Sequence, residues 1–177
     1  MTEGLIHIYT GEGKGKTTAG MGLAIRAAGQ GLNVCIIQFL KGGNRGTGEQ
    51  RLIEEKLPGI EFICSDMIHP MFLKKKPLFT RMVEDAEKTF QLCKEKAMSR
   101  EYDLLVLEEI NNVVANEWLD WVEVATFLEG KPKELEVVLT GRDAHPRLQA
   151  MADYVTEMLK IKHPYDKGYI ARRGIEY

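Results

Sequence analysis

Residues 10–18, TGEGKGKTT, decide which fold this chain is expected to adopt. The apolar stretch before them, residues 5–9, predicts a strand, and the Ala- and Gly-rich stretch after them, as far as about residue 30, predicts a helix. A glycine-rich loop that ends in Gly-Lys-Thr between a strand and a helix is typical of phosphate binding, because its N–H groups converge on phosphate oxygens. The first glycine of the general motif falls where this chain has Thr10, so a strict search would miss it. The alternative, a glycine-rich turn with exposed lysines, is disfavoured by the flanking strand and helix.

The loop predicts particular partners for a nucleotide. Lys16 is expected to reach the distal phosphates as a point charge, and the Thr17 hydroxyl is expected to bind a Mg²⁺ ion that keeps most of its waters. These two residues are the candidate catalytic residues. The candidate nucleotide-binding residues of the loop are Gly11, Glu12, Gly13, Lys14, Gly15, Lys16, Thr17 and Thr18.

Strand and helix patterns alternate along the rest of the chain. The near-continuous apolar run at residues 33–39 is typical of a strand covered on both faces, which favours a parallel sheet. Further strands are predicted at residues 60–64, 103–107, 135–139 and 154–161, and helices before residue 57 and at residues 79–97 and 119–128. We therefore predict an α/β fold, a doubly wound and mostly parallel sheet of about 5–6 strands with helices on both faces, similar to P-loop NTPases. Residues 1–177 are expected to form a single domain with an irregular rim loop at 65–78 and an irregular C-terminal tail.

Two polar groups that follow later strands extend the candidate site. Glu108 and Glu109 come directly after a buried strand, where a phosphate-binding fold normally supplies a carboxylate for the metal. Adjacent side chains at a strand end point opposite ways, so one of the two is expected to face the metal that Thr17 binds. Arg142 follows the next predicted strand, at the edge of the sheet where doubly wound folds bind ligands. A turn that ends in an exposed arginine is the alternative for Arg142.

Composition and charge exclude several classes of protein. The 24 Lys and Arg against 26 Asp and Glu give a formal charge of −2, too weak a field to favour a nucleic acid or an acidic membrane as partner. No apolar run of the sequence is long enough to cross a bilayer. Cys35, Cys64 and Cys93 are widely spaced and follow no recognisable secretory segment, which favours free thiols in a reducing cytosol. We expect a soluble, cytoplasmic protein.

The loop and six further segments resemble a known family. The segments are residues 10–19, 38–42 (QFLKG), 103–111 (DLLVLEEIN), 140–142 (TGR), 152–158 (ADYVTEM), 162–164 (KHP) and 174–177 (GIEY). Together they resemble the P-loop-type ATP:corrinoid adenosyltransferases, the cob(I)yrinic acid a,c-diamide adenosyltransferase family, whose loop carries the same shifted first glycine. The resemblance implies transfer of the 5′-deoxyadenosyl group of ATP to Co(I) of a corrinoid, with release of triphosphate, in cobalamin biosynthesis or salvage.

The resemblance also implies cofactors, partners and site residues. Mg²⁺ with ATP as co-substrate, a corrinoid as acceptor, a reductant such as a flavoprotein, and a homodimer are expected. Carried over onto this chain, Lys41 and Arg142 help to shape the site, and Glu109 is the acidic residue on the metal side, with Glu108 where an Asp is usual. Because Co(I) attacks carbon and carries no proton, the reaction needs no general base and depends on stabilising the departing triphosphate.

The segment after the third predicted strand departs from the family. The family usually has a Gly-Phe-x-Trp-type segment there, whose aromatic side chains displace the lower axial ligand of cobalt, whereas this chain has SDMIHPMF at residues 65–72. Met71, Phe72 and Phe79 could form a substitute apolar wedge. Two other functions stay open: a diverged relative that binds ATP or a corrinoid without transfer, and a P-loop NTPase or kinase that cuts at phosphorus.

Overall fold

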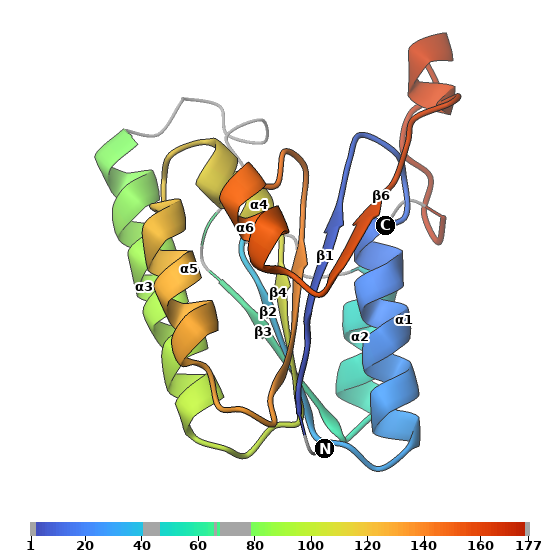
Figure 1. The fold of residues 1–177 in the computed structure, drawn as a ribbon. Helices are drawn as coiled ribbons and strands as arrows, with labels where there is room; N and C mark the ends of the chain where they lie inside the picture. The colour runs from blue at the N-terminus through green and yellow to red at the C-terminus, as the bar shows by residue number, and fades with distance from the viewer. Residues whose placement is uncertain (1–2, 41–46, 66, 68–78, 176–177) are drawn as a thin grey trace.

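Six parallel strands form one sheet in the computed structural model, which describes residues 3–40, 47–65, 67 and 79–175 (Figure 1). The strands are β1 (Ile6–Thr10), β2 (Val34–Gln38), β3 (Ile60–Cys64), β4 (Leu104–Glu108), β5 (Glu136–Thr140) and β6 (Tyr154–Glu157). Their order across the sheet is β3-β2-β4-β5-β1-β6, and all neighbouring strands run parallel. The chain first builds from β1 out to β3 and then returns through β4 and β5 to β6. The sheet is therefore doubly wound, as the sequence predicts.

Helices cover both faces of the sheet (Figure 1). One face carries α1 (Lys16–Gly29) and α2 (Gly48–Lys56), and the other carries α3 (Phe79–Met98), α4 (Ile110–Ala115), α5 (Trp121–Gly130) and α6 (Pro146–Met151). Successive residues of a strand point to opposite faces, so Ile36 packs in the core under α1 while Ile37 packs in the core under α3. Two apolar cores therefore require a strand that is apolar throughout, which explains the run at residues 33–39. The predicted fold class is confirmed.

Two short helices and one strand end differ from the sequence prediction. α4 and α6 have six residues each, and neither is predicted from the sequence, because so short a segment shows too little apolar periodicity to be recognised. β6 ends at Glu157 instead of continuing to residue 161. A short 3-10 helix at Pro164–Lys167 lies in the C-terminal tail, which projects away from the sheet (Figure 1).

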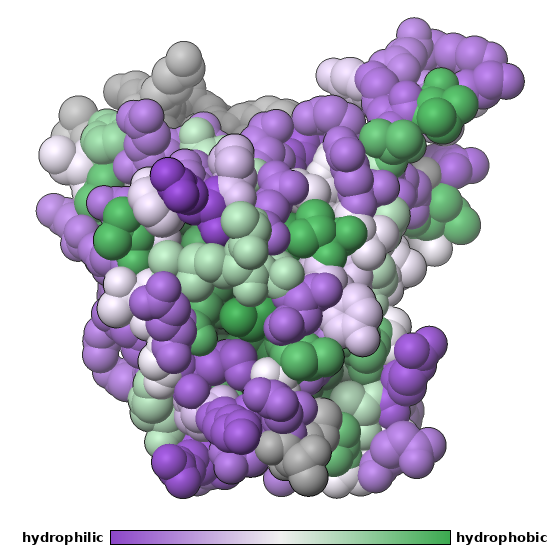
Figure 2. Space-filling view, in the orientation of Figure 1, coloured by the Kyte–Doolittle hydropathy of each residue, from purple (hydrophilic) through white to green (hydrophobic). Residues whose placement is uncertain are grey.

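Hydrophobic side chains are exposed on the projecting tail. Figure 2 shows hydrophobic residues among hydrophilic ones at the upper right, where the tail leaves the body. The exposed residues of the tail include Leu159, Ile161, Tyr165, Tyr169 and Ile170. No helix in the described parts of the chain is both long and apolar enough to span a membrane.

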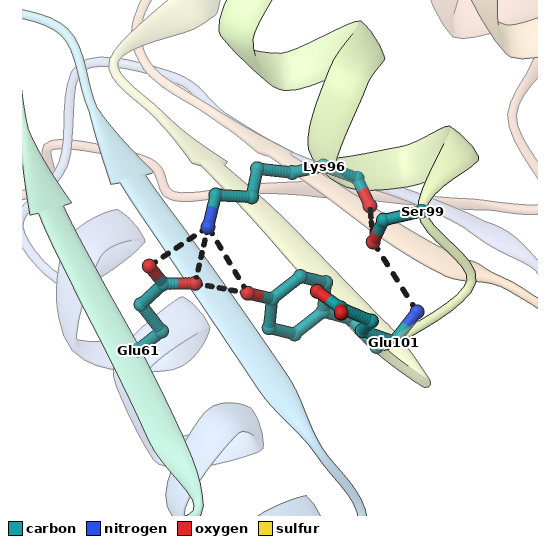
Figure 3. A network of polar contacts seen from close by, with 5 residues as sticks. Glu61, Lys96, Ser99 and Glu101 are labelled. Atoms are coloured by element: carbon teal, nitrogen blue, oxygen red, sulfur yellow. Dashed lines mark hydrogen bonds and ion pairs between the residues drawn. The ribbon is translucent and has the colours of Figure 1, made fainter.

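A network of polar side chains joins the edge strand β3 to α3 (Figure 3). Lys96 Nζ donates to both carboxylate oxygens of Glu61 at 2.8 Å, and the Tyr102 hydroxyl also donates to Glu61. Burial alone would raise the pKa of Glu61, but the hydrogen bonds from Lys96 and Tyr102 outweigh it, and the pKa is lowered overall. The ionised carboxylate therefore stabilises the contact between strand and helix.

Glu61→Gln is expected to lower the free energy of unfolding by about 1 kcal/mol near neutral pH, because the amide keeps the shape but loses the charge that attracts Lys96. Since folding lowers the pKa of Glu61, its contribution is present above the unfolded value of 4.5 and is lost as the pH falls below that value. Urea unfolding of both proteins across this pH range measures the difference. A difference of constant size down to strongly acidic pH contradicts the prediction.

Candidate nucleotide-binding site

The glycine-rich loop connects the end of β1 to the start of α1. β1 ends at Thr10 and α1 begins at Lys16, so residues 11–15 form the loop. Gly15 precedes the helix at a φ of 124°, which an L side chain rarely adopts, and as the N-cap residue it offers no side-chain acceptor to the first N–H groups of α1. The positive end of the helix dipole at this point favours an anion.

The backbone that continues β6 packs against this loop. Met158 N donates to Thr10 O at 2.8 Å, and Gly13 N donates to Met158 O at 2.5 Å. A Cβ on Gly13 would lie 2.6 Å from Met158 O. Gly13 is thus required by a close approach of two backbones, and its N–H has a protein acceptor, whereas from the sequence the glycines of the loop are expected to serve phosphate binding alone. The sequence carries no local signal for Met158, which is distant in the chain.

Gly13→Ala is expected to lower the free energy of unfolding by about 2 kcal/mol and to weaken ATP binding about tenfold, because the loop or β6 must shift to admit the methyl group. Gly22→Ala is the matched control, since nothing lies within 4 Å of a Cβ at that position in α1. The control is expected to stabilise the chain by about 0.5–1 kcal/mol. Thermal unfolding and ATP titration check both variants, and an unshifted ATP affinity in the Gly13→Ala variant contradicts the prediction.

Lys16 lies across the mouth of the loop. Its Nζ donates to Gly11 O at 2.6 Å and to Gly13 O at 2.7 Å. Burial lowers the pKa of Lys16, and the positive charge of Arg142 lowers it further, while the nearby charge of Glu109 acts in the opposite direction. An anionic ligand would stabilise this partly desolvated ammonium group, so the environment of Lys16 favours a phosphate chain.

Glu108 joins the first turn of α1 to the ends of β4 and β5. The Thr17 hydroxyl donates to Glu108 Oε1 at 2.5 Å, and the Thr140 hydroxyl donates to the other carboxylate oxygen. The Glu108 side chain is fully buried, whereas Glu109 has a left-handed backbone (φ 70°) at the start of α4, a partly buried side chain and a charge close enough to oppose the lowering of the pKa of Lys16 by burial. Of the two carboxylates, the one that meets Thr17 is Glu108. A carboxylate beside a threonine hydroxyl is a donor set that fits Mg²⁺ bound together with a nucleotide.

A tight turn after β5 places Arg142 opposite the loop. Arg142 N donates to Asn112 Oδ1 at 2.8 Å, and a Cβ on Gly141, where φ is 125°, would collide with the same oxygen. The guanidinium of Arg142 lies 3.4 Å from a carboxylate oxygen of Glu12 in the loop. The structure thus brings Arg142 to the glycine-rich loop. Asn112 is not predicted from the sequence, because the six residues of α4 are too few to show the apolar periodicity of a helix.

The family model for ATP:corrinoid adenosyltransferases BtuR/CobO/CobP matches residues 2–177 of this chain. The chain belongs to this family. A corrinoid adenosyltransferase from Sinorhizobium sp. is 38% identical over 177 residues, covering 99% of this chain and 81% of that protein. The Escherichia coli (strain K12) corrinoid adenosyltransferase is 34% identical over 174 residues, which cover 98% of this chain and 86% of the E. coli protein. The corrinoid adenosyltransferase CobA of Salmonella typhimurium (strain LT2) is 35% identical over 181 residues, with coverage of 98% and 86%.

Membership in the corrinoid adenosyltransferase family, and with it the class of enzyme, confirms the prediction from the sequence. The substrates implied by the family are ATP and a corrinoid. Among solved structures, domain III of the replication initiation protein DnaA from Thermotoga maritima is 16% identical to this chain. The match covers 87% of this chain and 53% of the DnaA chain, with a TM-score of 0.42.

Lys14 and Thr18 lie in or directly after the loop with exposed side chains, and three other predicted residues lie outside the described residues. Lys14 Nζ donates to Ile175 O of the tail at 3.0 Å, and Thr18 is exposed in the first turn of α1. Lys41, Met71 and Phe72 lie outside the described residues. The remaining residue of the expected apolar wedge, Phe79, begins α3 and is 56% exposed.

A cavity of about 400 Å³ lies between the end of β3 and α3. Cys64, Met67 and Leu92 are among the residues that line it. It adjoins the segment in which the sequence departs from its family.

Proposed function

We propose that this chain transfers the 5′-deoxyadenosyl group of ATP to Co(I) of a corrinoid and releases triphosphate. The observation that carries the proposal is the gathering of Lys16, Arg142 and the Thr17–Glu108 pair around one glycine-rich loop. Triphosphate is a highly charged leaving group. Fixed cations and N–H donors at its site therefore lower the barrier by stabilising the charge that develops on it.

The proposed reaction places few demands on the protein beyond charge and position. Co(I) supplies the electron pair of the new cobalt–carbon bond to C5′, the C5′–O bond breaks, and triphosphate leaves with the electrons of that bond. No proton leaves the nucleophile, so a general base is not required. Lys16 is expected to exchange its two loop carbonyls for oxygens of the phosphate chain. Mg²⁺ bound with ATP would be held by Thr17 and Glu108 and supplies further positive charge at the phosphates.

We assign the residues to roles on the same grounds. Lys16 and Thr17 are the proposed catalytic residues, and Glu108 joins Thr17 at the metal, with Glu109 nearby. The proposed nucleotide-binding residues are Gly11, Lys14, Gly15, Lys16, Thr17, Thr18, Lys41 and Arg142, and Gly13 is proposed to shape the loop, because its N–H is bonded to Met158 O. Glu12, the remaining residue of the predicted set, faces Arg142 and is left out of the binding residues. We further propose that residues 1–177 form one nucleotide-binding domain, since a single sheet contains all six strands.

The reaction products test the proposed function. A Co(I) corrinoid mixed with the protein and Mg-ATP under strictly reducing conditions is expected to lose its Co(I) absorbance bands, with formation of one triphosphate per cobalt–carbon bond. ADP or orthophosphate as the product would instead indicate cleavage at phosphorus. Binding of ATP without any loss of the Co(I) bands would indicate a relative without transferase activity. Either of these results overturns the proposal.

We propose a homodimer on the basis of the exposed edge of the sheet. All four residues of β6 are exposed, including Tyr154 and Val155, and the tail beyond it exposes further apolar side chains. An unpaired edge strand with exposed apolar residues is a ready surface for association. Sedimentation equilibrium at micromolar concentration checks this, and a monomer at all concentrations contradicts it.

We also propose that the reductant is a separate molecule, such as a flavoprotein, and that the protein works in the cytoplasm. Burial raises the pKa of Cys35 to about 12 and that of Cys93 well above its usual value, so these two thiols stay protonated, and a lone third thiol, Cys64, has neither of them available as a thiolate partner for a dithiol reduction. Free thiols persist in a reducing compartment. Turnover from a Co(II) corrinoid should therefore need an added reduced flavoprotein, and cell fractionation tests the location.

A further inference from the structure

The phosphate loop contains an acidic side chain in a place where a polyphosphate is expected. Glu12 lies between Gly11 and Gly13, and its carboxylate would repel a bound triphosphate at short range. In this structure the carboxylate faces Arg142, with 3.4 Å between Glu12 Oε2 and Arg142 Nη1. The loop therefore carries a negative charge of its own. Through it Glu12 forms an ion pair with Arg142, which is one of the cations around the site.

Arg142 is held near the loop by its backbone. The hydrogen bond from Arg142 N to Asn112 Oδ1 and the close packing of Gly141 on Asn112 fix the turn that carries it. The guanidinium is close enough to Lys16 for its charge to lower the pKa of that lysine. Two cations thus share a small region. The charges of Glu109, Glu12 and Glu108 all act to raise the pKa of Lys16 against the effect of burial, and Glu12 is the carboxylate that pairs with Arg142.

We propose that Glu12 is an internal counter-anion that the phosphate chain replaces at Arg142. This inference rests on the proposed function. Before a nucleotide binds, Glu12 neutralises Arg142, and once it has bound, Arg142 turns from the carboxylate to phosphate oxygens. Glu12 then competes with triphosphate for Arg142, so it weakens the binding of the product and speeds its release.

The chemistry of the pair favours such an exchange. The side chains of Arg142 and Glu12 are 53% and 57% exposed, so water screens their attraction and the pair is easily opened. A phosphate chain carries more charge than a carboxylate and offers several oxygens to the planar fork of an arginine. Arg142 can therefore exchange one anion for the other without leaving a buried charge unpaired.

Isothermal titration of the full chain with inorganic triphosphate and Mg²⁺ tests the inference without any need for turnover. Glu12→Gln is expected to bind triphosphate about threefold to fivefold more tightly than the wild type, which is the range of an exposed ion pair. The gain should disappear when Glu12→Gln is combined with Arg142→Gln. Adenosine, which carries no phosphate, should bind the wild type and Glu12→Gln equally.

Glu157→Gln is the matched control for simple removal of negative charge. Glu157 ends β6, and its side chain lies beside Gly11, but the ion pair with Arg142 is made by Glu12. The control is expected to tighten triphosphate binding by a smaller factor than Glu12→Gln. An equal gain in the control, or a gain from Glu12→Gln that persists without Arg142, would show that general repulsion is responsible and overturns the inference. Weaker binding by Glu12→Gln overturns it as well, because Glu12 would then contact the ligand or its metal favourably.

The same titration separates failure of this inference from failure of the proposed function. Triphosphate binding that Lys16→Ala abolishes, with no dependence on Glu12, overturns the exchange while the phosphate site stands. A wild-type protein that does not bind triphosphate overturns both.

Discussion

Lys16→Ala is expected to lower kcat/KM for ATP by about 1,000-fold in the transfer of the adenosyl group to a Co(I) corrinoid. The substitution removes the ammonium group that spans Gly11 O and Gly13 O at the mouth of the loop. That ammonium group is expected to stabilise the negative charge that develops on the departing triphosphate. Because the charge on the leaving group grows toward the transition state, both ATP affinity and kcat should fall.

Lys131→Ala is the matched control for Lys16→Ala. Lys131 Nζ also donates to two backbone carbonyls, Gly4 O at 2.6 Å and Leu135 O at 2.9 Å, and burial lowers its pKa as well. These carbonyls lie at the opposite end of the sheet from the loop, so the control should lose stability with no loss of ATP affinity. Steady-state kinetics and thermal unfolding of both variants check this. Equal kinetic losses in the two variants would mean that Lys16 acts through folding and not through the phosphates.

Glu108→Gln is expected to lower kcat/KM by about 100-fold, and Glu109→Gln by less than about fivefold. The amide in the first variant keeps the size of the buried side chain but removes the negative charge between Thr17 and Thr140. A metal ion bound with ATP loses an anionic partner at that position, so the Mg²⁺ concentration needed for half-maximal rate should rise. Glu109 is the natural control, because it is the adjacent residue with the same side chain but has a left-handed backbone and is only partly buried.

Kinetics over a range of Mg²⁺ concentrations measure this difference. A larger loss from Glu109→Gln than from Glu108→Gln contradicts the assignment and returns the metal-side role to Glu109, as the family resemblance alone implies. Circular dichroism separates a metal effect from a folding effect. The amide removes the cost of burying a charge but keeps only one of the two acceptor oxygens that Thr17 and Thr140 use, so Glu108→Gln is expected to fold with a modest loss of stability.

Much of the fold can be predicted from the sequence, because the patterns that indicate strands and helices lie within short segments. The apolar run at residues 33–39 indicates a strand covered on both faces, since adjacent residues of a strand point in opposite directions. The helix α3 can be predicted as well, because the spacing of apolar residues that forms one face of a helix recurs several times within its 20 residues. α4 and α6 escape this reasoning because six residues are too few. Because α4 is not predicted, Asn112, which accepts a hydrogen bond from Arg142 N and holds the turn there, is not predicted either.

The sequence by itself determined the glycine-rich loop between a strand and a helix, the alternation of strands and helices, and the family resemblance, because each is recognised from short segments of residues that are neighbours in the chain. Only the tertiary structure decided which carboxylate meets Thr17, from 91 residues away, and which cation the loop anion Glu12 faces. It also decided that Gly13 serves packing against Met158 as well as the loop. Contacts of this kind depend on the order of strands in the sheet and on the direction of single side chains. Neither of these is encoded in the spacing of residues along the chain.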